Sequence, residues 1–236
     1  MFLRIAIFED MKELKEQVLE ANFELMRSGL VIYTWGNASA IDRERGLVAI
    51  KPSGVKYESL KAEDIVVLDL DGRVVEGKLK PSSDTATHLE IYKSFSCAGA
   101  VVHTHSTYAT AWAQAGLDLP CLGTTHADCF HGPVPCTASL DPDAMAAAYE
   151  KETGMAIVRR FSRLDPATIP GVLVRNHGPF TWGKDTHSAV YNSVVLEEVA
   201  KMASITLALN PHAACPEDLQ EIHFLRKHGP KASYGQ

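Results

Sequence analysis

Two histidines separated by one residue are the first side chains in this sequence whose type and spacing could do chemistry. Residues 100–106 read Ala-Val-Val-His-Thr-His-Ser, and an apolar run with β-branched residues predicts a buried strand. Because side chains alternate along a strand, His103 and His105 are expected on one face, roughly 7 Å apart at Cα. Two imidazoles at this spacing can bind one metal ion such as zinc. A His-x-His pair alone is more often two half-buried strand histidines, so the hypothesis depends on the residues around it.

A third histidine and a carboxylate occur where a sheet could bring them to the first pair. His177 follows a second apolar strand at residues 171–175 and precedes a Gly-Pro turn, so it would lie beside His103 if the strands share a sheet. Asp84 begins a helical stretch, where capping explains it, but it could also be an oxygen ligand. Three histidines and a carboxylate could hold a Lewis-acidic ion for an aldolase-type reaction. A metallohydrolase, which would also need activated water and a base, stays an alternative.

Small and hydroxyl-bearing residues gather in three loops that suit an anion. The segments are Thr34-Trp35-Gly36-Asn37-Ala38-Ser39, Lys51-Pro52-Ser53-Gly54 and Lys80-Pro81-Ser82-Ser83-Asp84. Small residues let backbone N–H groups approach an anion, and hydroxyl, amide and ammonium groups donate to it. A helix that begins after the third loop adds its N-terminal N–H groups. Each loop alone is more often an ordinary turn or cap, but together with the candidate metal site they predict a phosphorylated substrate.

The composition limits the class of protein. The chain has 236 residues, of which 46% are hydrophobic and 22% are charged, and its formal net charge is −6. These values favour one globular domain over residues 1–236 and argue against a nucleic-acid partner. The five cysteines are odd in number and form no Cys-x-x-Cys pair, so we expect a reducing compartment and a cytoplasmic protein. No apolar run approaches the roughly 20 residues of a membrane span, so no membrane partner is expected.

The order of apolar periodicities and turn residues predicts an α/β fold. We expect helices over residues 9–28, 85–94, 107–115, 144–152, 186–209 and 217–228, and strands over 30–34, 47–50, 65–70, 73–76, 100–105 and 171–175. The third and fourth strands flank Asp71-Gly72, a typical hairpin turn, and residues 34–39 and 122–133 are expected to be loops. Hairpin signals without strict βαβ alternation predict a mixed, largely antiparallel sheet covered by helices.

Several motifs follow one another in an order that resembles a known family. They are Gly36-Asn37, Lys51-Pro52-Ser53-Gly54, Pro81-Ser82-Ser83-Asp84, His103-Thr104-His105, Thr125-His126-Ala127-Asp128, Asn176-His177-Gly178-Pro179 and Ser233-Tyr234-Gly235-Gln236. From about residue 9 to residue 236 the sequence resembles the L-ribulose-5-phosphate 4-epimerases of the class II aldolase and adducin-head superfamily. Residues 1–8 read as an N-terminal extension beyond the resemblance. One departure is Ser233, where the family often has tyrosine, whereas Tyr234 is retained.

The resemblance implies a three-layer α/β/α fold and a C4 homotetramer with active sites at its subunit interfaces. It implies zinc, or another divalent ion, bound in each subunit by Asp84, His103, His105 and His177. It implies contacts to the substrate and its phosphate from Gly36, Asn37, Lys51, Ser53, Gly54, Ser82, Ser83 and Arg226. Asp128 and Tyr234 would be the acid/base pair, with Tyr234 supplied by a neighbouring subunit. No role is assigned to His126, His131 or His223.

The reaction that the resemblance implies is zinc-dependent epimerisation at C4 of L-ribulose 5-phosphate to D-xylulose 5-phosphate, by retro-aldol cleavage and re-addition. Pathways such as L-arabinose catabolism use this step, and the motifs do not distinguish them. A class II sugar-phosphate aldolase is the nearest alternative, and the resemblance implies that such aldolases carry glutamate where this chain has Asp84. A non-catalytic, adducin-like interaction domain is the alternative from a different class. Loss of the candidate metal-binding histidines would favour that alternative, but all three are present.

Overall fold

The computed structural model describes residues 2–230 and 232, with side chains from residue 11 onward. The helices of this part are α1 (Phe2–Arg27), α2 (Thr85–Ser94), α3 (Thr107–Ala115), α4 (Thr124–Ala127), α5 (Pro142–Arg160), α6 (Thr186–Leu209) and α7 (Glu217–His228). The strands are β1 (Asn37–Asp42), β2 (Leu47–Ile50), β3 (Val66–Asp69), β4 (Val74–Glu76), β5 (Ala100–His103), β6 (Gly171–Val174) and β7 (Gly178–Gly183). Among the described helices, none has the length and apolarity needed to cross a bilayer.

The seven strands form one sheet in the order β4-β3-β2-β1-β5-β7-β6. All six pairings between these strands are antiparallel, and one isolated parallel bridge joins Cys136 to Leu173 of β6. The prediction of a largely antiparallel sheet is therefore confirmed. β1 and β5 lie in the middle of the sheet, so the residues at their ends are surrounded by neighbouring strands and loops.

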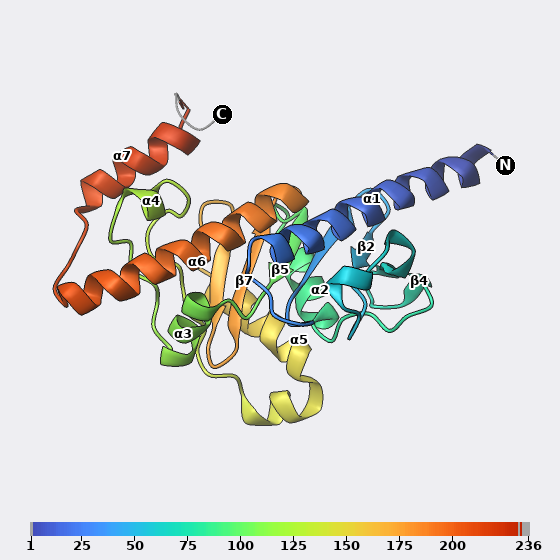
Figure 1. The fold of residues 1–236 in the computed structure, drawn as a ribbon, viewed down its shortest axis with the longest axis horizontal. Helices are drawn as coiled ribbons and strands as arrows, with labels where there is room; N and C mark the ends of the chain where they lie inside the picture. The colour runs from blue at the N-terminus through green and yellow to red at the C-terminus, as the bar shows by residue number, and fades with distance from the viewer. Residues whose placement is uncertain (1, 231, 233–236) are drawn as a thin grey trace.

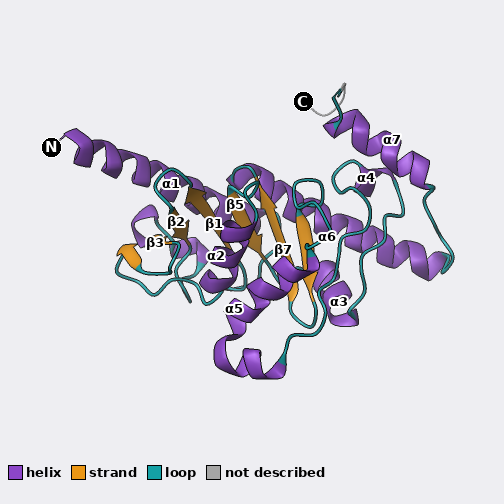
Figure 2. Ribbon diagram, turned by 180° about the vertical axis from the view of Figure 1, so that it is seen from behind, coloured by secondary structure: helices purple, strands orange, loops and turns teal. Residues whose placement is uncertain are grey.

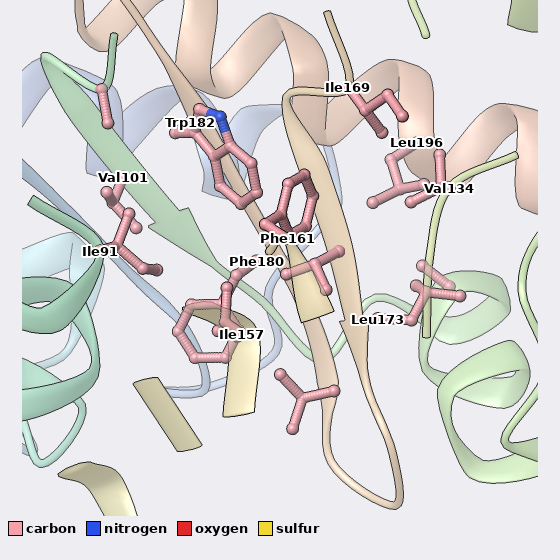
Figure 3. Close-up of a cluster of buried hydrophobic side chains, with 14 of the residues drawn as sticks. Ile91, Val101, Val134, Ile157, Phe161, Ile169, Leu173, Phe180, Trp182 and Leu196 are labelled. Atoms are coloured by element: carbon pink, nitrogen blue, oxygen red, sulfur yellow. The ribbon is translucent and has the colours of Figure 1, made fainter. Parts of the chain in front are cut away.

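Helices cover both faces of the sheet, as Figures 1 and 2 show from opposite sides. α1 and α6 lie over one face, where Val18 and Val190 pack against Ala40 and Val102. α2 and α5 lie over the other face, where Ile91 and Ile157 belong to the cluster around Val101, Phe180 and Trp182 in Figure 3. The opposite orientation of Val101 and Val102 follows from the alternation of side chains along β5. His103, two residues after Val101, therefore faces the layer that contains α2.

The stretch at residues 30–34 is not a strand, so that prediction is wrong. α1 ends at a left-handed glycine, Gly29, with φ +69°, and the N–H group of Leu30 donates back to the Leu25 carbonyl at 3.1 Å, the geometry of a Schellman cap. The chain then turns instead of extending. The strand that follows is β1, of which residues 37–39 were expected to be loop. Its small residues hid it from the sequence pattern, but they suit a strand that is buried beneath α1.

Other elements differ from expectation mainly in length. α1 begins at Phe2 and so includes most of the residues read as an extension. α5 begins at Pro142, with Asp141 accepting a hydrogen bond from the Ala144 N–H group, and continues to Arg160 across a break at Ala148. β7 and the short α4 occupy segments that were read as turn and loop. The hairpin at β3 and β4, the strands β2 and β6, and helices α2, α3, α6 and α7 are confirmed.

Candidate functional site

Three histidines converge at one end of the sheet. β5 ends at His103, which pairs with Asn37 of β1 on one side and with Phe180 of β7 on the other. His177 lies in the turn that joins β6 to β7, and the expected proximity of this histidine to the first pair is confirmed. His105 lies beyond the end of β5, so strand alternation does not place it. It reaches the same site because the chain turns between β5 and α3.

The geometry of the three imidazoles fits one metal ion. One ring nitrogen from each of His103, His105 and His177 lies within 4.8 Å of the others. His103 donates its Nδ1–H group to the Pro179 carbonyl oxygen at 3.0 Å, which leaves the lone pair of Nε2 free to bind an ion. The Nε2 atoms of His103 and His105 are 3.0 Å apart. At this distance the two nitrogens can share one positive species, either a proton or a metal ion.

Burial keeps these histidines in the form that binds a metal. It lowers the pKa of His103 to about 3, and it also lowers the pKa values of His105 and His177. Neutral imidazole, not imidazolium, is the ligand in metal sites. The buried Nδ1 atom of His177 has no hydrogen-bond partner among the described residues, which is costly unless a ligand or water satisfies it. The donor set and this orphaned atom both fit a divalent ion.

Asp84 lines the same pocket, but its carboxylate is held by neighbouring side chains. It occupies the N-cap position of α2 without a side-chain capping bond, so capping does not explain the residue. Its Oδ2 atom accepts a hydrogen bond from Asn37 Nδ2 at 2.7 Å and lies 3.5 Å from Ser82 Oγ. Burial raises the pKa of Asp84, but the nearby imidazoles and the Asn37 amide outweigh burial and hold it below the ordinary value. Its oxygens are not among the atoms that converge within 4.8 Å, and its role as a fourth ligand stays a prediction.

The histidines and the three anion-suited loops enclose one cleft of about 410 Å³. Backbone contacts join two of these loops: Ser53 N–H donates to the Lys80 carbonyl at 2.9 Å, and Ser82 N–H donates to the Lys51 carbonyl at 3.1 Å. The cleft is lined by the expected substrate-contacting residues Gly36, Asn37, Lys51, Ser53, Gly54, Ser82 and Ser83. Segments about 45 residues apart in the chain, such as Asn37 and Ser82, thus meet in a single pocket.

Lys51 is a buried cation in this cleft. Its residue is only 2% exposed, and its ammonium group donates a weak hydrogen bond to the Pro52 carbonyl at 3.4 Å and lies 4.8 Å from the centre of the Tyr57 ring. Burial lowers its pKa to about 8, because the charged form is disfavoured away from water. No carboxylate among the described residues pairs with this ammonium group, and a buried charge of this kind gains from an anionic ligand. Lys51 is therefore suited to hold a phosphate.

Comparison with known proteins shows the family of this chain. Residues 16–204 match the Class II Aldolase and Adducin N-terminal domain. The chain belongs to this family. A solved L-fuculose 1-phosphate aldolase is 27% identical, with a TM-score of 0.77 over 91% of this chain and 95% of that chain. YgbL from Klebsiella pneumoniae, described with aldolase, epimerase and decarboxylase as candidate activities, is 25% identical, with a TM-score of 0.71 over 90% and 98%. YgbL from Escherichia coli is also 25% identical, with a TM-score of 0.72 over 91% and 99%.

Asp128 and Arg226, two further expected site residues of this class II aldolase-family chain, do not line the histidine pocket. Asp128 is the C-cap residue of α4, and its carboxylate contacts α7 through a hydrogen bond with His223 Nδ1 at 3.0 Å and an ion pair with Lys227 Nζ at 3.7 Å. It lines a second cleft, of about 700 Å³, that shares no lining residue with the histidine pocket. Arg226 lies on α7, which packs beside α4 at one end of the protein (Figure 1). Tyr234 lies outside the described residues.

Sequence reasoning missed several residues of the histidine pocket. Tyr149 and Glu150 line it from α5, directly after the non-helical residue Ala148 at φ −161° and ψ 75°. The Tyr149 ring centre is 5.9 Å from that of His177. No sequence signal marks this break, because it falls in a run of alanines, which favour unbroken helix. Trp35 also lines the pocket; it was part of a loop motif, but no role was assigned to it.

Proposed function

We propose that this protein is an L-ribulose-5-phosphate 4-epimerase that uses a divalent ion, with zinc as the expected metal. The observation that carries the proposal is the single cleft in which three convergent histidines, a tethered Asp84 and a buried Lys51 lie together. The cleft offers a metal site and a phosphate site within reach of one small molecule. Membership of the class II aldolase and adducin family supports an enzyme of the sugar-phosphate aldolase and epimerase type.

The environment of Asp84 favours epimerisation over simple aldol cleavage. The resemblance implies that aldolases of this superfamily carry a glutamate at this position, which also serves as the base. Asp84 is one methylene shorter, and its carboxylate already accepts a hydrogen bond from Asn37 at 2.7 Å. A short, tethered carboxylate is suited to stay beside the histidines. It is poorly suited to move a proton on and off a substrate carbon, because proton transfer requires the base to reach that carbon.

The chemistry of the substrate explains why a metal site and a phosphate site are both needed. In L-ribulose 5-phosphate the C4 hydrogen is not α to the C2 carbonyl, so its removal leaves a carbanion without stabilisation. If the C4 hydroxyl loses its proton and the C3–C4 bond breaks, the electron pair stays on C3 in conjugation with C2, as an enediolate, and C4 becomes an aldehyde. Addition to the other face of that aldehyde, with return of the proton to the new C4 oxygen, gives D-xylulose 5-phosphate. A divalent ion, when bound, supplies the positive charge that this step requires.

Residues of the chain hold the two fragments together. Lys51 provides a positive charge, and the hydroxyl groups of Ser53 and Ser83 provide hydrogen bonds for the phosphate. The N-terminus of α2, which begins at Thr85, adds N–H groups of its first turn, although that of Thr85 itself already donates to the Ser82 carbonyl at 3.2 Å. The aldehyde fragment carries the phosphate, so these contacts keep it in place between cleavage and re-addition. Retention of this kind converts a bimolecular recombination into an effectively unimolecular one.

The acid/base groups are proposed to come from a neighbouring subunit. A proton-transfer group must be within hydrogen-bond reach of its substrate, but Asp128 lines a cleft that shares no residue with the histidine pocket of its own chain. A homotetramer with interfacial active sites would bring Asp128 and Tyr234 of one subunit to the pocket of the next. The oligomer is thus required by the proposed mechanism, and its symmetry is expected to be cyclic.

The aldolase alternative has one observation in its favour, the 27% identity to an L-fuculose 1-phosphate aldolase. A non-catalytic adducin-like domain is disfavoured, because a purely structural surface gives no reason for three histidine nitrogens within 4.8 Å of one another. The two enzymatic candidates differ in their products. The aldolase releases two fragments, whereas the epimerase returns one isomerised sugar.

The test is turnover of L-ribulose 5-phosphate by the purified protein, with and without a metal chelator, with D-xylulose 5-phosphate as the assayed product. We expect product that disappears with the chelator and returns with added Zn²⁺. In parallel, ketose 1-phosphates are assayed for release of dihydroxyacetone phosphate. No epimerisation by the zinc-loaded oligomer, combined with release of dihydroxyacetone phosphate, would replace this proposal with the aldolase.

A further inference from the structure

The loop between α1 and β1 presents large apolar side chains that the fold does not bury. Tyr33 is 78% exposed, Ile32 is 55% exposed and Trp35 is 53% exposed. Tyr33 also has a positive φ of 54°, a conformation that is unfavourable for a bulky aromatic residue. Strained backbone of this kind persists only where the surroundings enforce it, and it occurs preferentially at functional sites.

The loop is held in place by a turn of its own and by contacts at Gly36. The Trp35 N–H group donates to the Ile32 carbonyl at 3.0 Å, and the Tyr57 hydroxyl donates to the Gly36 carbonyl at 2.7 Å. Gly36 has φ +104°, and a Cβ atom there would lie 2.8 Å from the carbonyl oxygen of His103. Only glycine allows the loop to approach β5 this closely. Trp35 is therefore held at a defined position beside the metal-binding end of the strand.

The Trp35 ring lies at the pocket as an exposed apolar plane. It lines the cleft, and its centre is 6.5 Å from that of His105 at an interplanar angle of 41°. Tyr33 supports it from the side in an edge-on arrangement, with ring centres 6.1 Å apart. Most other side chains that line the cleft are polar or charged. The indole thus offers the pocket a broad apolar surface next to groups that bind charge.

We propose that Trp35 is a specificity-determining residue whose indole face packs against the C–H groups of a phosphorylated ketose. This inference rests on the proposed function for the identity of that ligand. The polar donors and the histidines recognise the phosphate and the sugar oxygens, and Trp35 covers the carbon chain between them. Covering this chain removes apolar surface from water and restrains the aldehyde fragment after C3–C4 cleavage. Inorganic phosphate, which has no carbon chain, gains nothing from the indole.

Tryptophan fluorescence tests the contact without relying on turnover. The chain has three tryptophans; Trp182 is buried, and the half-buried Trp112 donates its indole N–H group to Ala200 and Ser204. Acrylamide should therefore quench mainly the emission of Trp35. We expect L-ribulose 5-phosphate, or the mixture that its turnover produces, to reduce this quenching, and inorganic phosphate to leave it unchanged. Trp35→Phe should abolish the ligand-dependent difference, whereas the matched control Trp112→Phe should retain it. Equal quenching with and without the sugar phosphate would overturn the proposal.

Kinetics test the consequence for the reaction. Trp35→Leu should raise KM for L-ribulose 5-phosphate about tenfold, a typical worth of an aromatic contact, and should release detectable glycolaldehyde phosphate that wild-type protein retains. Trp35→Phe should keep a KM close to that of the wild type and should retain most of the glycolaldehyde phosphate, because it keeps an aromatic face. An unchanged KM in Trp35→Leu would overturn the inference, and so would a rise in KM that is explained entirely by dissociation of the oligomer.

The two proposals can fail separately. If the protein does not epimerise L-ribulose 5-phosphate but this or a ketose 1-phosphate still protects Trp35 from acrylamide, the contact stands and the proposed reaction is wrong. If epimerisation proceeds but Trp35 is neither protected nor required for a low KM, the reaction stands and the role of Trp35 is wrong.

Discussion

The histidine pocket and the region around Asp128 differ in how the fold constructs them. The pocket is built at the ends of central strands, where His103 and Asn37 are buried and paired across the sheet. The Asp128 region lies where α7 packs on α4, and its contacts include a hydrogen bond and an ion pair between half-buried side chains. The first region brings three convergent histidine nitrogens and a buried lysine together within one chain. The second supplies titratable groups but, among the described residues, no convergent set of metal ligands.

The proposed mechanism assigns different roles to these two surfaces of the same chain. Groups that hold ligands benefit from burial, since a low-dielectric site strengthens electrostatic contacts. Groups that transfer protons must be brought to the substrate in the correct geometry. In the proposed mechanism each active site combines the histidine pocket of one subunit with the α4 and α7 region of the next.

The largest expected effect is loss of the metal site. His105→Ala removes one of three convergent ring nitrogens and should abolish retention of zinc through gel filtration, with activity reduced about a thousandfold or more. Metal content per subunit and the epimerisation rate are the measurements. His212→Ala, which removes an exposed histidine far along the chain from the pocket, is the matched control and should behave as wild type. Full activity in metal-free His105→Ala would refute the metal site.

Subunit complementation tests whether the two regions meet across an interface. His105→Ala and Asp128→Asn should each be nearly inactive alone, because each lacks one half of every site. Random hybrids of the two variants contain some interfaces with both halves intact. In a cyclic oligomer each site takes its histidine pocket from one subunit and Asp128 from the next. Both halves are intact in about a quarter of the sites of a random hybrid, so about a quarter of the activity should return. Recovery is measured after co-expression or after dissociation and reassembly of mixed subunits. Hybrids that assemble but stay inactive would contradict the division between subunits.

Much of the histidine pocket was predictable from the sequence because its residues carry chemical signatures. The pocket combines three unusual motifs: His-x-His at a strand end, a third histidine before Gly-Pro, and serine-rich loops before a helix. Their order along the chain resembles that of one family. The long helices α6 and α7 were predictable from apolar periodicity. These features are local, so single segments of the chain reveal them.

The parts that the sequence did not predict depend on tertiary context. β1 is made of small residues that read as loop, and it is a strand because it lies between β2 and β5. Tyr149 and Glu150 line the pocket directly after the break of α5 at Ala148, which lies within a run of alanines. The capping explanation for Asp84 failed because Asn37 and Ser82, distant in sequence, hold its carboxylate. The sequence likewise carries no local signal that Asp128 lies in a different cleft from the histidines.

A smaller effect is expected when Lys51 in the histidine pocket is replaced. Lys51→Met keeps most of the side-chain volume and removes the buried charge, so KM should rise about 10- to 100-fold, the worth of a charge-assisted hydrogen bond. kcat should change less, because the phosphate does not take part in bond cleavage. Lys78→Met, which removes an exposed lysine, is the control. A large fall in kcat with an unchanged KM would show that Lys51 acts on the reacting atoms instead of on the phosphate.

The smallest expected effect is a pH dependence that belongs to the same lysine. Burial lowers the pKa of Lys51 from the usual 10.5 to about 8, so the ammonium form that attracts phosphate is present below about pH 8 and is lost above it. Because kcat/KM reports the free enzyme, it should fall on the alkaline side of about pH 8 as KM rises. Lys51→Arg keeps its charge throughout this range and should move the fall to higher pH, whereas Lys51→Met should show a low value without this fall. If kcat/KM of Lys51→Met falls over the same pH range, another group causes the fall. The lowered pKa of Lys51 would then not affect phosphate binding.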